Sequence, residues 1–478
     1  MIAPWIIEEM KTLDLEDQRR NQRAQIILDG LAQIAESQPD AAKSTAALKA
    51  TYRFVDNKFI DLDRLLTPHN QSSIARTTKY RQVILANDTT EFDLTKPNCQ
   101  IDGAGPLESN DKFGFYFHPL YALTPEGLAI GAVDQVIWTR ESIRLGLSKE
   151  EKDRLRKQTA FEEKESQRWL AMFQSGEQIA RANPGTEYVI VGDSESDIHE
   201  VFAETRELPK NYHFVIRAAQ DRAIVNGGKS LTVDAVLASA PLKFTSKLEI
   251  SERVSKITGE TRARRKSREA RLADVSVRAV SVTIRGPARP GGRLPDVKLN
   301  VVDSVELDPP AGEDPIRWVL LTTLPIDSRQ ELLRVIESYR CRWNIELYFK
   351  TLKSGLKTED LRYETLERYL KAFALFIVIA WRVEYLKGAA RLDGEASCEK
   401  YFKPEEWQPA YLVYHDGERQ PVEPPTMMEF MLMIAELGGW QRKKTQGPPG
   451  STTIWRGIRK MEAYADAFQV FKKAEKRS

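Results

Sequence analysis

Cysteine and long apolar runs are the two features that this sequence of 478 residues most lacks. Its three cysteines, Cys99, Cys341 and Cys398, are far apart and form no C-x-x-C pair. That spacing excludes a disulfide framework and a thiolate zinc site, and it fits a reducing cytoplasm. The most apolar run, residues 372–381, has about half of the roughly 20 residues that a bilayer-spanning helix needs. We therefore expect a cytoplasmic protein with no membrane role, and we interpret this run as a buried core helix.

An excess of charge of one sign is also missing. The chain has 71 lysines and arginines against 69 acidic residues, so its formal net charge is only +2. A polyanionic partner must therefore be met by local basic patches, because the chain as a whole has no basic excess. The N-terminus lacks the basic and apolar regions of a signal peptide. The length exceeds what one hydrophobic core supports and predicts about three domains.

Residues 1–62 are predicted to be an N-terminal helical domain, because apolar residues recur at helical spacing until Pro39 interrupts them. Basic residues are spread through this segment, and Tyr52 and Arg53 are its candidates for contacting DNA. The alternative is a small helical cap with a mixed-charge surface, because acidic residues balance much of the basic charge.

Residues 63–364 are predicted to form a mixed α/β domain, because apolar strand patterns alternate with helical ones. Residues of about 221–310 have the alternation of further β-strands and are interpreted as an insertion. The insertion contains the most basic run of the chain, RARRKSREAR, in which Arg264, Arg265 and Lys266 are candidate phosphate contacts. A solvated hairpin tip is the alternative for this run. Residues 365–478 are predicted to be a C-terminal helical domain.

The segment YRCRWNIELYFKTLK, residues 339–353, contains no glycine or proline, and a capping-box pair, Ser328 and Glu331, lies upstream. The pattern predicts one helix with an apolar face. The opposite face would gather a phenol, a guanidinium, a carboxylate and two amines, from Tyr339, Arg342, Glu346, Lys350 and Lys353. Opposite charges four residues apart usually decorate a solvated helix, so this row matters only if other carboxylates meet Glu346.

Two other carboxylates follow short apolar runs that are typical of strands buried in the middle of a sheet. Asp88 follows VILAN, and Asp193 follows YVIVG. If the two strands are neighbours, these acids lie about 5–7 Å apart at one edge of the sheet. Glu195 and Asp197 are close enough in the sequence to replace Asp193, and an aspartate after a strand is also common as a turn or cap residue.

Two acids on strands and a third on a helix can hold two divalent ions about 3.5–4 Å apart. Oxygen ligands select Mg²⁺, for which Mn²⁺ can substitute, over thiophilic metals. This arrangement suits phosphoryl transfer, in which one ion activates the attacking water or 3′-hydroxyl and the other stabilises the leaving oxygen. Arg342, Lys350 and Lys353 would then hold phosphates.

The spacing Tyr339-x2-Arg342-x3-Glu346-x6-Lys353 resembles the Tyr-Arg-Glu-Lys signature of the bacterial insertion-sequence transposases related to the transposon-five (Tn-five) enzyme. ANDTTEF and VIVGDSESDIHEVF resemble the family's segments around its first and second aspartate. ATYRF, EEKESQRWL and ELGGW resemble further family segments in the same order, so the resemblance covers nearly the whole chain.

The resemblance implies a ribonuclease-H-like fold, which is a mixed α/β sheet core with a β-strand insertion between N- and C-terminal helical domains. It implies that Asp88, Asp193 and Glu346 are the catalytic, metal-binding triad, and it favours Asp193 over its acidic neighbours. Two Mg²⁺ ions per active site are the implied cofactors.

The family's reaction is cut-and-paste transposition. Water cleaves one strand at the transposon end, the freed 3′-hydroxyl attacks the opposite strand to form a hairpin, and the reopened ends join target DNA. Hairpin formation in the family uses a flipped base stacked on a tryptophan, whose place Trp318 takes; the alternative is a core indole in a strand. Tyr339 and Arg342 resemble residues that hold the adjacent phosphate, and Arg217 resembles a further DNA contact.

The implied partners are transposon-end DNA, target DNA and a second copy of the chain, joined through residues 365–478 in a synaptic dimer. The implied location is the bacterial cytoplasm, on the nucleoid when DNA is bound. Two other functions stay open: a two-metal nuclease or resolvase without strand transfer, and a non-catalytic, transposase-derived DNA-binding protein. Trp318 and the basic signature favour the transposase, because plain hydrolysis needs no flipped base.

Overall fold

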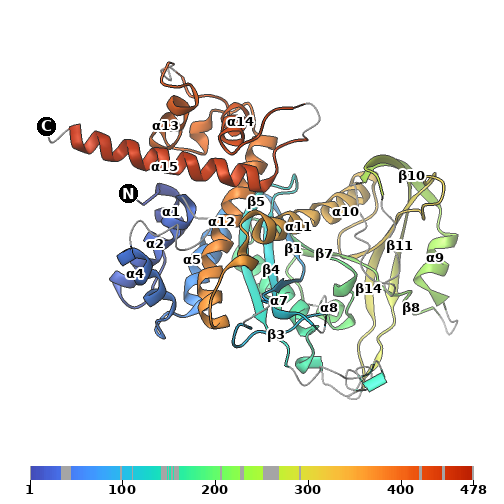
Figure 1. The fold of residues 1–478 in the computed structure, drawn as a ribbon. Coiled ribbons are helices and arrows are strands. Elements are labelled where there is room, and N and C mark those ends of the chain that lie inside the picture. Colours follow the sequence, from blue (N-terminus) through green and yellow to red (C-terminus); the bar gives the residue numbers. More distant parts are fainter. Residues whose placement is uncertain are drawn as a thin grey trace. The chain divides into compact units, whose positions relative to one another are not determined.

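A computed structural model describes the chain apart from several short segments and divides it into two compact units (Figure 1). The residues outside the described part are 1, 34–44, 97–99, 110, 142–147, 149, 152–153, 155–160, 205–206, 227–230, 251–267, 290–291, 419–422, 444–446 and 476–478. The first unit comprises Met1–Arg81, Asp88–Lys164 and Trp343–Ser478. The second unit comprises Gln82–Asn87 and Glu165–Arg342.

The N-terminal part of the first unit is helical, as the sequence pattern predicts. Its helices are α1 (Pro4–Glu9), α2 (Gln18–Gln33), α4 (Thr45–Val55) and α5 (Leu62–Thr77). Asp61 caps α5, because its side chain accepts hydrogen bonds from the Asp63 and Arg64 amides.

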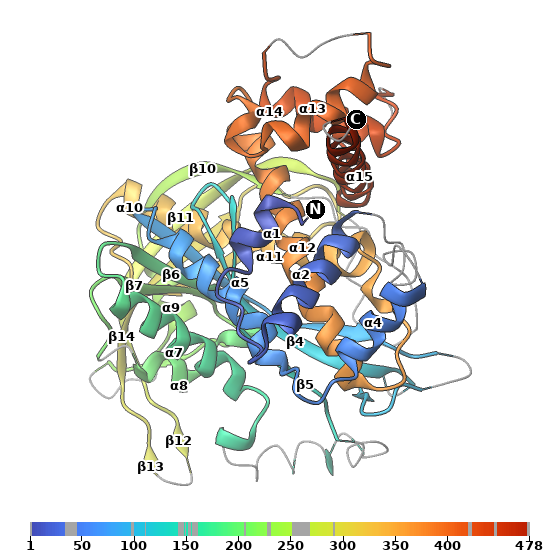
Figure 2. The same cartoon turned by 90° about the vertical axis from the view of Figure 1, so that its left-hand side faces the viewer.

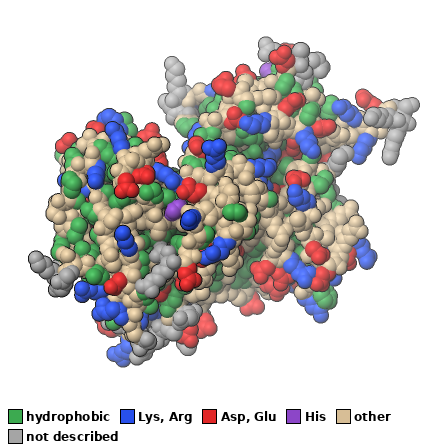
Figure 3. Space-filling view, turned by 180° about the vertical axis from the view of Figure 1, so that it is seen from behind, with side chains coloured by type: hydrophobic (Ala, Val, Ile, Leu, Met, Phe, Trp, Pro, Cys, Tyr) green, Lys and Arg blue, Asp and Glu red, His purple; other side chains and the backbone are tan. Residues whose placement is uncertain are grey.

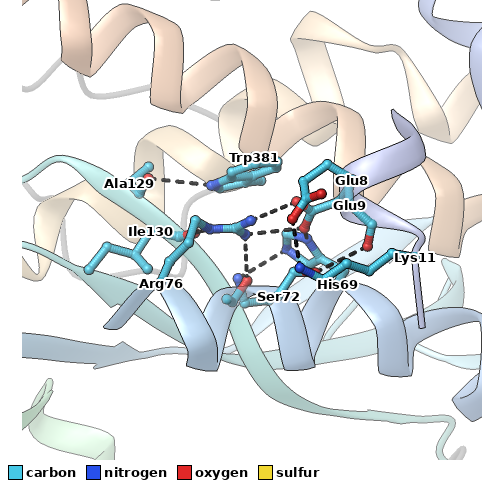
Figure 4. A network of polar contacts seen from close by, with 11 residues as sticks. Glu8, Glu9, Lys11, His69, Ser72, Arg76, Ala129, Ile130 and Trp381 are labelled. Atoms are coloured by element: carbon cyan, nitrogen blue, oxygen red, sulfur yellow. Dashed lines mark hydrogen bonds and ion pairs between the residues drawn. The ribbon is translucent and has the colours of Figure 1, made fainter. Parts of the chain in front are cut away.

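A buried polar network joins α1 to α5 and to α12 (Leu366–Leu392) (Figure 4). Glu9 accepts hydrogen bonds from His69 Nδ1 and from Arg76 Nη1, each at 2.6 Å. His69 Nε2 accepts from the Ala132 amide at 3.2 Å, which fixes the neutral tautomer with its proton on Nδ1. Burial lowers the pKa of His69, and the Arg76 guanidinium lies 4.0 Å from the Trp381 ring centroid in α12. The first helix is therefore fastened to the interior of the unit.

The strands of the first unit form an antiparallel set around β4 (Phe113–Leu123), with α12 against it. β2 (Thr90–Asp93), β3 (Gly105–Pro106) and β5 (Ala129–Trp138) all pair with β4 in antiparallel fashion. Phe373 of α12 packs edge to face against both Phe92 and Phe115, with centroid distances of 4.8 and 5.2 Å. Residues 372–381 are all buried, which confirms the core helix predicted from the apolar run.

Three helices end the first unit: α13 (Pro404–Tyr414), α14 (Met427–Leu437) and α15 (Ser451–Glu475) (Figure 1). A Cβ atom at Gly457 would lie 1.8 Å from the Ile434 carbonyl oxygen, so only glycine lets α15 cross α14 this closely. Trp5 Nε1 of α1 donates a hydrogen bond to Glu462 Oε1 of α15 at 3.1 Å. Burial, reinforced by the neighbouring Glu406, raises the pKa of Glu462 to about 8.

The second unit contains a mixed sheet. β1 (Gln82–Asn87), β6 (Glu187–Gly192) and β7 (Tyr212–Arg217) are parallel neighbours in that order. β15 (Arg317–Thr322) then pairs with β7 in antiparallel fashion. Helices α7 (Gln167–Ala182) and α10 (Arg329–Cys341) pack on these strands, and Tyr212 Oη donates a hydrogen bond to the Phe173 carbonyl of α7 at 2.7 Å.

Beyond β15 the sheet continues into the region predicted as an insertion. β14 (Val297–Glu306) pairs with β15, β11 (Arg271–Ile284) pairs with β14, and β10 (Leu242–Ile250) pairs with β11, all antiparallel. The short strands β8 (Ala223–Ile224) and β9 (Leu231–Thr232) and the helices α8 (His199–Ala203) and α9 (Val233–Ser239) also belong to this unit. Figure 2 shows the small β12–β13 hairpin (Ala288–Arg289 and Gly292–Arg293) at one end of the β11–β14 ribbon.

Within the described residues, no helix combines the length and the apolar character that crossing a bilayer requires. On the face drawn in Figure 3, basic and acidic side chains are interspersed. This distribution fits the small net charge of the chain.

Candidate active site

The ends of β1 and β6 lie side by side in the second unit. The two strands are parallel, and their register pairs Ala86 with Val191. One residue further, a Cβ atom added to Gly192 would lie 3.0 Å from Asn87 Oδ1, so the last residues of both strands are adjacent. Asp88 and Asp193 are the residues that directly follow these two strand ends.

Local hydrogen bonds hold both aspartates. Asp193 Oδ1 accepts the Glu195 amide proton at 2.8 Å and thereby caps a 3₁₀ turn, Ser194–Ser196. Asp88 Oδ1 accepts the Thr89 amide proton, also at 2.8 Å. Both side chains are half-buried. An aspartate held in this way keeps its second carboxylate oxygen oriented, which suits a metal ligand.

Asp197 has a different environment from Asp193. Its side chain is fully buried and forms an ion pair with Arg222 at 2.6 Å. It also accepts hydrogen bonds from the Ala219 amide at 2.8 Å and the Gln220 amide at 3.1 Å. These bonds satisfy the carboxylate, so Asp197 is a structural residue that fastens the turn after β7. Glu195, the other alternative acid, is paired with Arg168 at 3.0 Å.

Glu346 lies on α11 (Trp343–Lys350) in the first unit. The predicted capping box is confirmed, because the Ser328 side chain accepts the Glu331 amide proton at 3.2 Å and the Glu331 carboxylate accepts the Ser328 amide proton at 2.8 Å. The prediction of one uninterrupted α-helix is wrong. α10 ends in a tighter turn, in which the Arg342 amide donates to the Tyr339 carbonyl at 3.1 Å.

A π-helical turn, Thr351–Gly355, follows α11. The Leu356 amide donates to the Thr351 carbonyl at 2.8 Å, and the Thr351 hydroxyl donates to Glu384 of α12. This turn changes the phase of the helix at Lys353, so the predicted row of polar residues is not one straight stripe. The predicted apolar face is confirmed, because its members are buried: Cys341, Ile345, Tyr348 and Leu352.

Lys353, in the π-helical turn after α11, lies close to β2, the strand that begins two residues after Asp88. Its Nζ lies 5.2 Å from the ring centroid of Phe92 in β2. Burial lowers the pKa of Lys353, and the negative charges of Glu359, Glu91 and Glu346 oppose that shift. Of these acids Glu346 was predicted, whereas Glu359 and Glu91 were not, although Glu91 lies within ANDTTEF beside the first aspartate. Glu346 is therefore one of the acids whose negative charge acts on Lys353.

The second unit brings Trp318 and Tyr339 together. Their rings meet edge to face with centroids 5.1 Å apart, and the Arg342 guanidinium lies 5.9 Å from the Tyr339 ring centroid. Trp318 is half-buried. Tyr339 is only 5% exposed, so other protein atoms and not solvent surround the Tyr339 ring. Arg217 lies one strand away, paired with Leu320 of β15, and is exposed.

The remaining predicted DNA contacts are scattered. Tyr52 and Arg53 lie on α4 and are exposed, and Lys350 is exposed on α11. Arg264, Arg265 and Lys266 of the basic run lie outside the described residues.

Three family models match separate parts of the chain. A transposase DNA-binding model matches residues 2–60, a transposase DDE domain matches residues 171–381, and a transposase Tn5 dimerisation domain matches residues 378–474. The matched DDE range contains Asp193 and Glu346 and begins after Asp88. The predicted fold class, a ribonuclease-H-like α/β core between helical regions, is confirmed by this match and by the mixed sheet.

Among solved structures, the chain is similar to one described as the cryo-EM structure of the piggyBac transposase synaptic complex with hairpin DNA. The two are 9% identical, the similarity covers 96% of this chain and 81% of that chain, and the TM-score is 0.36. At this TM-score the likeness supports no conclusion about the present chain.

Proposed function

The chain belongs to the Tn5-type DDE transposases, and on that premise we propose that it performs cut-and-paste transposition through a hairpin intermediate. A DDE transposase acts on DNA with divalent metal ions. The DNA-binding and dimerisation matches make DNA and a second copy of the chain its partners.

We assign the catalytic triad to Asp88, Asp193 and Glu346. The observation that carries this assignment is the parallel register of β1 and β6, whose adjacent ends directly precede the two aspartates. Consecutive Cα atoms are about 3.8 Å apart. The Cα atom of each aspartate therefore lies about that distance from the Cα atom of the last residue of its strand. Lys353 gives separate support, since its charge interacts with Glu346 and its Nζ lies 5.2 Å from the ring centroid of Phe92 in β2, the strand that starts two residues after Asp88.

Three carboxylates form a hard-oxygen donor set, which fits Mg²⁺ or Mn²⁺. Asp193 supports this fit, because its Oδ1 accepts the Glu195 amide proton and the carboxylate is thereby already oriented. Two divalent ions held by Asp88, Asp193 and Glu346 would supply activation of the attacking oxygen and stabilisation of the leaving oxygen.

The DNA chemistry then follows in three stages. Water attacks the phosphorus at the transposon end, the P–O3′ bond breaks, and the transposon strand keeps a 3′-hydroxyl. That hydroxyl attacks the phosphorus of the opposite strand, which closes a hairpin and releases the flanking DNA. A second water opens the hairpin, and the same 3′-hydroxyl attacks target DNA. Arg342 and Lys350 hold phosphates near the reacting strand, since fixed cations stabilise the charge that develops there.

Trp318 and Tyr339 support the hairpin route. A tight hairpin requires one base to leave the stack, and an aromatic platform stabilises such a base by about 1–3 kcal/mol. The half-buried Trp318 indole is held edge-on by Tyr339, so its ring is kept in one orientation.

The test is incubation of the full chain with Mg²⁺ and labelled DNA that carries the terminal sequences of its transposon. We expect nicks, then hairpins, then joined products. Asp88→Ala, Asp193→Ala and Glu346→Ala each abolish cleavage and keep end binding, whereas the exposed control Asp308→Ala keeps both activities. Nicks without hairpins would instead identify a two-metal nuclease, and a mobility shift without cleavage would identify a non-catalytic DNA-binding protein.

A further inference from the structure

The π-helical turn Thr351–Gly355 decides where the side chain of Lys353 points. In a π-helix each amide bonds to the carbonyl five residues earlier, so the turn holds one residue more than an α-helical turn. One extra residue rotates the side chains after it by about 100° relative to an uninterrupted α-helix. In an α-helix the Leu352 carbonyl would accept the Leu356 amide proton, whereas here it accepts the Thr358 hydroxyl at 3.0 Å. The position of Lys353 therefore depends on the contacts that keep this turn.

The proton of the Thr351 hydroxyl is donated outside its own helix. A threonine inside a helix commonly donates to the carbonyl four residues earlier. Thr51 and Thr67 of this chain do so, at 3.1 and 2.8 Å. Thr351 is 0% exposed, and its hydroxyl donates instead to Glu384 Oε1 of α12. Glu384 therefore holds the first residue of the π-helical turn from a different helix.

Glu384 also bonds to the first residue of α15. Its side chain is 9% exposed, and its Oε1 accepts a hydrogen bond from Ser451 Oγ at 3.0 Å. Lys387 donates to both carboxylate oxygens, at 2.9 and 3.0 Å, and to Ser451 Oγ at 2.7 Å. Hydrogen bonds to an ionised group are the stronger ones in proteins. One carboxylate thus joins the π-helical turn, α12 and α15.

A second contact supports the other end of the turn. A Cβ atom added to Gly355 would lie 3.8 Å from Ser451 Cβ and 3.5 Å from Thr351 Cγ2, both of which are ordinary van der Waals distances. Ser451 therefore lies against the last residue of the turn, while Glu384 bonds to the first. Lys353 is the middle residue of the turn, between these two supports.

We propose that Glu384 is a positioning residue for strand cleavage, because it holds the π-helical turn and thereby places Lys353 beside β2. Without this carboxylate, the Thr351 hydroxyl can bond to the Leu347 carbonyl four residues earlier, and the turn can close into a regular α-helix. Closure rotates Lys353 away from β2. The inference rests on the proposed function, since it concerns the cleavage step.

The first test is the single-turnover rate at which the full chain cleaves labelled transposon-end DNA with Mg²⁺, measured below the Tm of each variant. We expect Glu384→Ala to lower this rate about tenfold or more and to keep end binding. Glu384→Gln should recover most of the loss, because its amide oxygen still accepts from Thr351 and Ser451. The matched control is Glu367→Ala, which should keep the rate. Glu367 is exposed on α12 and also pairs with a lysine, Lys371, at 2.6 Å.

A double substitution shows whether Glu384 acts through Lys353. In the Lys353→Met chain, Glu384→Ala should lower the rate by less than about twofold further, because the side chain that Glu384 positions is already gone. An unchanged rate in Glu384→Ala would overturn the proposal. So would equal rates for Glu384→Ala and Glu384→Gln, or a loss in the Lys353→Met chain as large as in the unaltered chain.

Cross-linking examines the turn without any cleavage. Gly355→Cys and Ser451→Cys together place two thiols on Cβ atoms 3.8 Å apart, which is about the mean spacing in disulfides. Mild oxidation should close this disulfide about tenfold faster in the chain that keeps Glu384 than in Glu384→Ala. Equal closure rates would overturn the proposal whether or not the chain cleaves DNA. If the unaltered chain cleaves no DNA, the proposed function fails, and the closure rates still show whether Glu384 holds the turn.

Discussion

Asp193 and Asp197 lie four residues apart, yet their substitution should have opposite consequences. Asp197→Ala removes a fully buried carboxylate and leaves the Arg222 guanidinium, 11% exposed, without its partner. Breaking a buried ion pair from one side costs about 3–5 kcal/mol. Asp193→Ala removes one hydrogen bond that caps a short 3₁₀ turn, which costs about 0.5–2 kcal/mol.

These energies translate into a measurable separation in thermal unfolding. A loss of 1 kcal/mol lowers Tm by about 2–4 °C in a unit of this size, so Asp197→Ala should lower it by roughly 6–20 °C. Asp193→Ala should lower it by no more than roughly 8 °C. Strand cleavage is measured well below both transitions, where each variant is folded. Under that condition we expect Asp197→Ala to cleave transposon-end DNA and Asp193→Ala not to cleave it.

Arg222→Met provides the matching change on the other side of the ion pair. It should reproduce the loss of stability, because it leaves the buried Asp197 carboxylate unpaired. The reasoning is refuted if Asp197→Ala keeps its Tm and loses cleavage, since Asp197 would then be the catalytic acid. It is equally refuted if Asp193→Ala still cleaves.

Three further predictions concern other parts of the chain. Trp318→Ala should lower the hairpin yield about 5- to 150-fold, the equivalent of about 1–3 kcal/mol of lost stacking, and leave the first nick unchanged. Trp318→Phe should give a hairpin yield between those of Trp318→Ala and the unaltered chain. An equal loss of nicking and hairpin formation would indicate a structural role for Trp318. Burial lowers the pKa of Lys353, so the single-turnover rate of cleavage should decline as rising pH removes the charge of this side chain. Lys353→Arg should shift that decline to higher pH, because arginine keeps its charge. Identical pH profiles for the two proteins would exclude Lys353 as the group whose titration causes the decline. The pKa of Glu462 is about 8 in the folded state and 4.5 ordinarily. Between these two pH values Glu462 is protonated in the folded state and ionised in the unfolded state, so the free energy of unfolding falls as pH rises from about 4.5 to about 8. Glu462→Gln, which can still accept from Trp5, should flatten this fall in Tm, and an unchanged slope would contradict the assignment.

Local patterns in the sequence predict much of this fold. The capping box at Ser328 and Glu331 needs only two residues at the right spacing, and the apolar runs before Asp88 and Asp193 describe strands buried on both faces. Both features depend on neighbours in the sequence, and for that reason they were predictable.

Features that depend on distant partners were not predictable. The π-helical turn at Thr351 is accompanied by a hydrogen bond to Glu384, which lies 33 residues further along the chain. Asp197 is a structural residue because Arg222 and the turn after β7 meet it, and no local spacing distinguishes it from Asp193.

The most direct test of the central claim is to map the metal site chemically. Fe²⁺ replaces Mg²⁺ in the full chain, and ascorbate with peroxide then generates hydroxyl radicals that cut the backbone near the bound ion. If Asp88, Asp193 and Glu346 share their ions, the fragments should end near all three positions, and excess Mg²⁺ should suppress every cut together. Cuts near only one of these acids, or near none of them, would contradict a common metal site.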